Sequence, residues 1–469
     1  MKNFLQNLVL LLLLFISCKD AVKNTRKESA VSDLERIMET GRIKVVTDYN
    51  STNYFIYRGQ PMGYQFELLQ ELADYMGVKL EVTVSNNLTE NFERLATGEV
   101  DLFASNLAVT KERREIVDFT VPHSQASQVL VQRKPDNWQK MNKKDIEGHL
   151  LRNQLELSGK TIYVQSNSSH LARLRNLAEE IGDSITIVQV DEDVEMLISK
   201  VANGEIDYTV SDEHVAAVNQ TYYPNIDVET MVSFPQNMAW AVRKGSIGFC
   251  NEINNWLSDY KKTRRFNIMY ARYFSNQKSS EIVGSDFYAI NSGKISEYDK
   301  YIKKYSKEID WDWRLVASLI YQESRFKPTA VSWAGAFGLM QLMPRTARKM
   351  GVDENASPVE QIKAGIELIK WLEDRFMYIK DRPERVKFVL ASYNVGFGHV
   401  LDAQKLAEKD GKDPNKWDDC VDLYLLKKSD PAFYKDPVVK HGYCRGVETY
   451  NYVSQILDRY EHYKNIISD

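Results

Sequence analysis

The stretch Leu315–Pro344, LVASLIYQESRFKPTAVSWAGAFGLMQLMP, decides how the C-terminal part of the chain is organised. Val316, Leu319 and Ile320 recur at helical spacing, and Glu323 follows them at seven, four and three positions. The Glu323 carboxyl group is therefore expected on the apolar face of a helix. Burial raises the pKa of a carboxyl group, as a general acid near neutral pH requires. The alternative is a Glu that caps the helix or pairs with the arginine two residues later.

Composition limits the classes of protein to consider. A chain of 469 residues with 43% hydrophobic and 27% charged residues predicts two or three folded domains. The net charge of −4 and the absence of long runs of one sign give no support for nucleic-acid binding. The sequence contains neither a CxxC pair nor an HExxH motif, so we expect no metal site and no cofactor.

The first residues have the pattern of an export signal. Lys2 precedes the short apolar run Leu8–Ile16, which ends at Ser17-Cys18 and resembles a bacterial lipobox. We expect residues 1–18 to be a lipoprotein signal, with lipidation at Cys18, and residues 19–39 to be a polar tether to the membrane. A signal cleaved elsewhere, or a short anchor, is the alternative. The protein is expected to work outside the cytoplasm.

Residues 40–275 alternate short strands with helices, which is typical of an α/β fold. Leu95–Asp101, LATGEVD, is echoed 106 residues later by Val201–Asp207, VANGEID. Val129–Pro135, VLVQRKP, and Ala239–Gly245, AWAVRKG, form a second pair. We interpret the echoes as two α/β lobes. Lobe one is expected at about residues 40–131 and 239–275, and lobe two at about 132–238.

This region resembles the family 3 extracellular solute-binding proteins, through stretches such as LATGEVDLFASNLAVTKERREIVDFTVPH and NGEIDYTVSDEHVA. The resemblance implies a two-lobed, periplasmic-binding-protein-like domain for an amino acid or a muropeptide. It assigns ligand contacts to Arg113, Asp212, Ser169 and Asn106, with Arg113 gripping a carboxylate. A solvated charged loop is the alternative for Arg113, and a helix cap for Asp212. The polar insertion Lys134–Gly159 departs from the family pattern.

A polar linker is expected at residues 276–290, and residues 291–469 form a mostly helical pattern. Ser357-Pro358-Val359-Glu360 is a capping box that predicts the start of one of these helices. Four motifs follow in order along this region: Gln322-Glu323-Ser324, Gly335–Pro344, Ala391–Gly396 and Gly442–Val453.

The four motifs resemble those of soluble lytic transglycosylases, which share a lysozyme-like fold. The resemblance implies cleavage of the β-1,4 bond between N-acetylmuramic acid and N-acetylglucosamine in peptidoglycan, with a 1,6-anhydro product and peptidoglycan strands as partners. Glu323 would be the single general acid and base, because no equally convincing second carboxylate is present. The resemblance assigns substrate contacts or positioning to a further set: Ser332, Met340, Gln341, Tyr393, Asn394, Glu448 and Tyr452. Of these, Tyr393 is expected to hydrogen-bond Glu323 or the N-acetyl group; the alternative is that Met340 belongs to the core and Asn394 caps a helix.

The expected protein is therefore multidomain, an α/β two-lobed domain followed by a mostly α lysozyme-like domain. By resemblance it is lipid-anchored in the cell envelope, at the outer membrane facing the periplasm. Two other readings remain open: a solute receptor with a non-catalytic wall-binding domain, and a hydrolytic muramidase. A Cys420–Cys444 disulfide is expected for an exported protein, with two buried thiols as the alternative.

Overall fold

The computed structural model describes residues 32–182, 184–274 and 293–467. The expected signal, the lipidation site Cys18, most of the tether and the expected linker at residues 276–290 lie outside these residues. Among the helices of the described residues, none is long and apolar enough to cross a membrane.

One lobe of the front domain is built on a mixed sheet with strand order β4-β1-β5-β13-β6, and β7 also pairs with β13. β1 runs parallel to β4 and β5, whereas β13 is antiparallel to β5. The strands are β1 (Arg42–Thr47), β4 (Lys79–Val84), β5 (Leu102–Ala108), β6 (Val117–Phe119), β7 (Ser124–Ala126) and β13 (Gln236–Arg243). The helices of this lobe are α2 (Asp33–Thr40), α3 (Tyr64–Met76), α4 (Leu88–Thr97), α5 (Lys111–Ile116), α10 (Ile247–Tyr260) and α11 (Arg264–Phe274).

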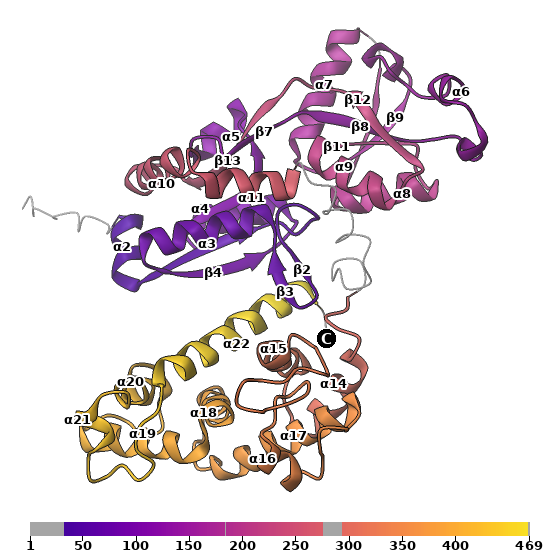
Figure 1. Cartoon of the computed structure of the whole chain (residues 1–469). Coiled ribbons are helices and arrows are strands. Elements are labelled where there is room, and N and C mark those ends of the chain that lie inside the picture. Colours follow the sequence, from indigo (N-terminus) through magenta and orange to yellow (C-terminus); the bar gives the residue numbers. More distant parts are fainter. Residues whose placement is uncertain (1–31, 183, 275–292, 468–469) are drawn as a thin grey trace, which may run out of the picture.

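The second lobe has a five-stranded sheet with strand order β10-β9-β11-β8-β12 (Figure 1). Its strands are β8 (Gln128–Arg133), β9 (Thr161–Gln165), β10 (Thr186–Val190), β11 (Tyr208–Asp212) and β12 (Ile226–Met231). Its helices are η1 (Trp138–Lys140), α6 (Lys143–Glu147), η2 (Gln154–Leu157), α7 (Ser169–Ile181), α8 (Val194–Asn203) and α9 (Glu213–Tyr222).

The two sequence echoes have physical counterparts in the lobes. Gly98 and Gly204 end α4 and α8 with φ values of 80° and 82°, a left-handed conformation that glycine adopts without a Cβ clash. Each glycine leads toward a strand at the centre of its own sheet, β5 or β11. The chain crosses between sheets from β7 to β8 and returns from β12 to β13, a few residues before the expected positions 131 and 239.

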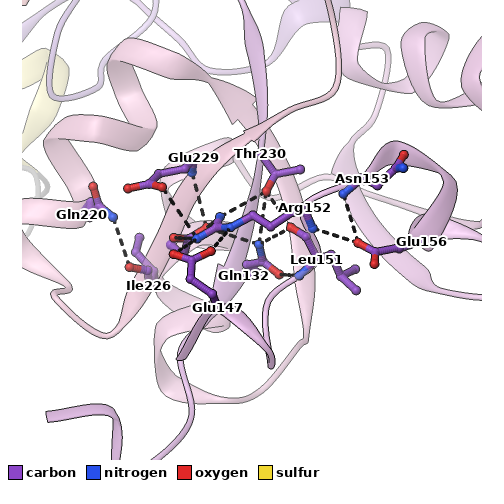
Figure 2. Close-up of polar contacts among 11 residues, drawn as sticks. Gln132, Glu147, Leu151, Arg152, Asn153, Glu156, Gln220, Ile226, Glu229 and Thr230 are labelled. Carbon is purple, nitrogen blue, oxygen red and sulfur yellow. Dashed lines mark hydrogen bonds and ion pairs between the residues drawn. The ribbon is translucent and has the colours of Figure 1, made fainter. Parts of the chain in front are cut away.

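The polar insertion Lys134–Gly159 is fastened to the second lobe by Arg152 (Figure 2). The Arg152 guanidinium lies 2.6 Å from both Asp227 and Glu147, and Glu229 is 3.7 Å away. The side chain of Gln132 on β8 also holds the insertion, through its bonds to the backbone of Leu151. The insertion is thus part of the lobe that carries β8 and β12.

The C-terminal domain is helical (Figure 1), and residues Trp313–Ile320 of its helix α15 are all buried. Asp312 caps this helix by accepting from the backbone N–H of Arg314 at 2.9 Å. The capping box at Ser357 is confirmed at the start of α17. The helices are α14 (Asp299–Ser306), η3 (Lys307–Ile309), α15 (Trp313–Ser324), α16 (Pro344–Lys349), α17 (Pro358–Arg375), α18 (Arg382–Val395), α19 (Phe397–Lys409), η4 (Trp417–Val421), α20 (Asp422–Lys427), α21 (Pro431–Tyr434) and α22 (Gly446–Ile466).

The Cys420–Cys444 disulfide is absent from the structure. Both residues are buried free thiols, as is Cys250 on α10. The Cys444 side chain packs in the core of the helical domain, and Cys420 lies in the irregular turn η4. The alternative of two buried thiols therefore replaces the expected disulfide.

The front domain contacts the helical domain through the hairpin of β2 (Phe55–Tyr57) and β3 (Gln60–Met62). Ile56 of β2 is fully buried in the same hydrophobic cluster as the core of the helical domain. Figure 1 shows α22 running toward this hairpin, and the Tyr463 hydroxyl on that helix donates to the carbonyl oxygen of Gly59 at 2.5 Å.

Candidate active site and ligand-binding cleft

Glu323 lies in the last turn of α15, where the helix ends at a left-handed Arg325 with a φ of 51°. Burial raises the pKa of the Glu323 carboxyl group to about 7, and a hydrogen bond from the Tyr452 hydroxyl acts in the opposite direction. No ion pair of Glu323, with Arg325 or another cation, occurs among the described residues. The group is thus positioned to hold a proton near neutral pH and to release it.

Tyr452 comes from α22, so the partner of Glu323 lies 129 residues away in the sequence. The Tyr393 hydroxyl on α18 instead donates to the backbone oxygen of Met340 at 2.7 Å. Of the two bonds expected for Tyr393, the one to Glu323 is therefore not formed in this structure, and the one to the N-acetyl group of the substrate stays a prediction. Burial, and to a smaller extent the charge of Glu323, raises the pKa of Tyr393.

The loop after α15 is folded back on itself beside Glu323. The Gln341 amide donates to the carbonyl oxygens of Ala330 at 2.9 Å and Gly338 at 2.8 Å. Ser332 accepts from the backbone N–H of Ala336 at 3.0 Å. Both polar residues expected at the substrate therefore also hold the shape of this loop.

Met340 does not line the cleft with its side chain. The side chain is 1% exposed, and a Cβ added to Gly365 on α17 would lie 2.3 Å from its terminal methyl group. Met340 is thus a core residue whose backbone oxygen holds Tyr393. Sequence reasoning missed Gln361 on α17, which accepts from the backbone N–H of Leu339 at 2.7 Å and so secures the loop against the core.

The other two predicted residues of this site, Asn394 and Glu448, bond to side chains of the protein itself. Asn394 accepts from the Thr449 hydroxyl at 2.7 Å, which links α18 to α22. Glu448 is exposed and pairs with Arg445 at 3.1 Å. Neither residue has a recorded bond to Glu323, so their part in catalysis stays a prediction.

Of the front-domain residues predicted from the resemblance, Arg113 bonds both lobes. The Arg113 guanidinium donates to the carbonyl oxygens of Ala108 in one lobe and Asn167 in the other, at 3.1 and 3.4 Å. Burial lowers its pKa to about 10, and the charge of Asp212 opposes this shift. Asp212 lies 3.2 Å from the imidazole of His170.

Two other residues predicted to contact the ligand, Asn106 and Ser169, form hydrogen bonds within the front domain. Asn106 accepts from Gln65 at 2.8 Å, and Ser169 accepts from Gln128 at 3.2 Å. The sequence reasoning did not find Asp48, whose pKa is raised by burial and further by the like charge of Asp212. The position of Asp48 directly after β1 is the feature of the sequence that could have identified it as a cleft residue.

The two lobes also bond each other directly across the cleft. Asn167 donates to Thr89 at 2.7 Å, and the backbone N–H of Ser51 donates to Glu195 at 3.0 Å. A cavity of about 750 Å³ adjoins these contacts and is lined by residues of both lobes, among them Tyr49, Asn86 and Asp193. Among the described residues there is no group of three or more metal-ligating side chains.

Comparison with known families agrees with this architecture. Residues 42–276 match the model of bacterial extracellular solute-binding proteins, family 3, and residues 300–416 match the transglycosylase SLT domain. Together with the fold, these matches define the class of protein: a peptidoglycan-cleaving lytic transglycosylase with a solute-binding front domain.

Relatives extend the similarity to nearly the whole chain. A membrane-bound lytic murein transglycosylase F from Desulfosudis oleivorans is 33% identical over 92% of each chain. One from Pseudomonas putida W619 is 33% identical over 92% of this chain and 86% of its own. The solved structure of the ancestral amino acid-binding protein AncCDT-1 is 26% identical and covers 52% of this chain and 100% of its own, with a TM-score of 0.44. The chain belongs to the membrane-bound lytic murein transglycosylase F family.

Proposed function

We propose that the helical domain cleaves the MurNAc-β-1,4-GlcNAc bond with Glu323 as the only acid and base. The protonated carboxyl group first gives its proton to the leaving glycosidic oxygen. The resulting carboxylate then takes the proton of the 6-hydroxyl group of the muramic sugar as that oxygen attacks the anomeric carbon. The substrate's N-acetyl group assists in place of a second carboxylate, and the product carries a 1,6-anhydro ring.

The observation that carries this proposal is the position of Glu323 at the end of α15, bonded to the Tyr452 hydroxyl, where burial raises its pKa to about 7. Among the described residues, the side-chain hydrogen bond of Glu323 comes from Tyr452 and not from a second carboxyl group. In glycosidases that use water or a covalent intermediate, two carboxyl groups flank the bond. A lone carboxyl group with a pKa near the working pH favours intramolecular transfer.

The front domain, in this proposal, is a sensor for an amino acid or a muropeptide. Arg113 would bind a carboxylate of the ligand, and Asp212 its ammonium group. The contacts across the cleft support a role in which ligand binding changes how the lobes meet.

The hairpin β2–β3, with the residue before it and the neighbouring strand β4, offers a physical route from the sensor to the active site. The Tyr54 hydroxyl bonds His462 on α22 at 2.7 Å, and Asn465 on the same helix donates to the backbone of β4 at 2.9 Å. Because Tyr452, the partner of Glu323, is on this helix, a shift of the hairpin would reach the catalytic carboxyl group. Coupling requires that ligand binds the two arrangements with different affinity.

We further propose the expected division of the chain: signal 1–18, tether 19–39, solute-binding domain 40–275, linker 276–290 and catalytic domain 291–469. Lipidation at Cys18 would hold the protein at the outer membrane, facing the periplasm. The lipobox pattern and the relatives named as membrane-bound support this location.

Mass spectrometry of digested peptidoglycan tests the reaction. Anhydro-muramic ends are expected. Reducing ends would instead indicate a hydrolytic muramidase, and no products would indicate a receptor whose helical domain only binds the wall. The sensor role is tested by the cleavage rate with and without added muropeptides, and equal rates would contradict it.

A further inference from the structure

A second cavity, of about 420 Å³, lies between the front-domain hairpin and the helices α15 and α22. Gln60 lines it from β3, Tyr321 and Gln322 line it from α15, and Gln455 and Arg459 line it from α22. It is separate from the cleft between the lobes, and Glu323 is not among its lining residues.

Two guanidinium groups, those of Arg325 and Arg459, line the cavity without an ion-pair partner among the described residues. The carboxylate in the lining is that of Asp458, which lies 2.8 Å from the ammonium group of Lys79. Burial lowers the pKa of Arg459, and the like charge of Arg325 acts in the same direction. Among the described residues, the two guanidinium groups of the cavity wall therefore face one carboxylate, which is already paired with Lys79, so the wall is positively charged overall.

The amide side chains in the wall present donors to the cavity because their oxygens are used elsewhere. Gln322 accepts from Arg459 at 3.0 Å, Gln455 accepts from Gln322 at 2.9 Å, and Gln60 accepts from the Tyr321 hydroxyl at 3.4 Å. An amide has two donors besides its oxygen, so the NH₂ groups of Gln455 and Gln60 stay available. The Arg459 guanidinium is held in place by the Tyr321 ring, 4.4 Å from the ring centre.

We propose that this cavity is a binding site for a small oxyanion, a carboxylate or a phosphate group. Two guanidinium groups and two amide NH₂ groups match the acceptors of such a group, and charge-assisted bonds of this kind are the strong ones. The bound anion would join Gln60 of the front domain to α15 and α22. The inference rests on these contacts alone and is independent of the reaction that Glu323 performs.

The test is a calorimetric titration of the full chain at constant ionic strength set with sodium chloride. Sodium phosphate is one probe and N-acetyl-D-alanyl-D-alanine the other, because inorganic phosphate and the carboxylates of wall peptides share this chemistry. The Arg113→Ala variant is used throughout, so that the front cleft does not contribute a carboxylate site. Saturable binding is expected for at least one probe, and which of the two binds identifies the source of the anion.

Arg325→Gln in this background is expected to weaken binding about tenfold, since it removes one charged donor pair. Arg58→Gln is the matched control, because Arg58 is also exposed and left-handed, with a φ of 48°, but lines the neighbouring cavity instead. An equal loss in both variants, or no saturable binding of either probe, would overturn the proposal.

A gain-of-charge variant tests the same site without relying on a loss. Gln455→Glu places a carboxylate on α22 four residues before Arg459, a spacing that favours an ion pair. This built-in carboxylate is expected to abolish binding of both probes and to raise the unfolding temperature in chloride alone. Unchanged binding of the probes in this variant would contradict the site.

Discussion

Replacing Glu323 by glutamine measures how much folding raises the pKa of this carboxyl group. Folding raises its pKa from 4.5 to about 7 because burial removes water from the charged form. Each factor of ten in proton affinity corresponds to about 1.4 kcal/mol. Ionising Glu323 in the folded protein therefore lowers the free energy of unfolding by about 3 kcal/mol relative to a solvated carboxyl group.

The sign follows from proton binding. Between pH 4.5 and about 7 the folded protein holds the Glu323 proton while the unfolded chain has lost it. The contribution of this group to stability is therefore greatest below the unfolded pKa and is lost as pH rises through the folded pKa. Glutamine is neutral at every pH. Between pH 5 and pH 8 the free energy of unfolding should therefore fall by about 2 to 3 kcal/mol less in Glu323→Gln than in the parent protein.

Urea unfolding at pH 5 and pH 8, on both proteins, provides the measurement. Subtracting the variant's pH difference from that of the parent cancels the other titrating groups. Glu408→Gln is the matched control, because Glu408 is exposed on α19 and the charge change is the same. The variant should also yield no anhydro-muropeptides. An identical pH dependence in parent and variant, or substantial residual cleavage, would refute a buried, proton-holding Glu323.

Three further changes test the surrounding structure. Tyr452→Phe removes the hydrogen bond that lowers the pKa of Glu323, so the alkaline limb of the pH–rate profile should move to higher pH; an unmoved limb would contradict that bond. Arg113→Ala should weaken ligand binding about tenfold or more in calorimetric titrations with amino acids and muropeptides, with an unchanged circular dichroism spectrum, and equal affinity would remove Arg113 from the site. Gly59→Ala places a methyl group 2.7 Å from Phe326 and 2.8 Å from the Tyr463 hydroxyl, at a φ of 78°. It should displace the hairpin and abolish any effect of muropeptides on the cleavage rate, and an effect as large as in the parent would exclude this route.

Features set by neighbouring residues were predictable from the sequence. The capping box at Ser357 starts α17 because its bonds join residues three apart, and that spacing is visible in the chain. The glycines at positions 98 and 204 end helices for an equally local reason, the left-handed backbone that they permit. Apolar spacing also placed Glu323 on its helix, because the period of a helix is fixed.

Features set by the packing of distant segments were not predictable in this way. The family resemblance gave Tyr393 as a partner of either Glu323 or the N-acetyl group, but α22 brings Tyr452 to Glu323, and Tyr393 binds the backbone of Met340. Two hydroxyl groups of the same kind compete for one carboxyl group, and only helix packing decides between them.

By itself the sequence determined the helix of Glu323, because local apolar spacing fixes it, while its resemblance to two families gave the order of the domains and the candidate residues of both sites. The tertiary structure decided which groups meet. It placed Met340 in the core, left Cys420 and Cys444 unpaired, and set Ile56 of the front domain into the core of the catalytic domain. Such contacts join residues far apart in the chain, so their geometry exists only once the helices and sheets have packed.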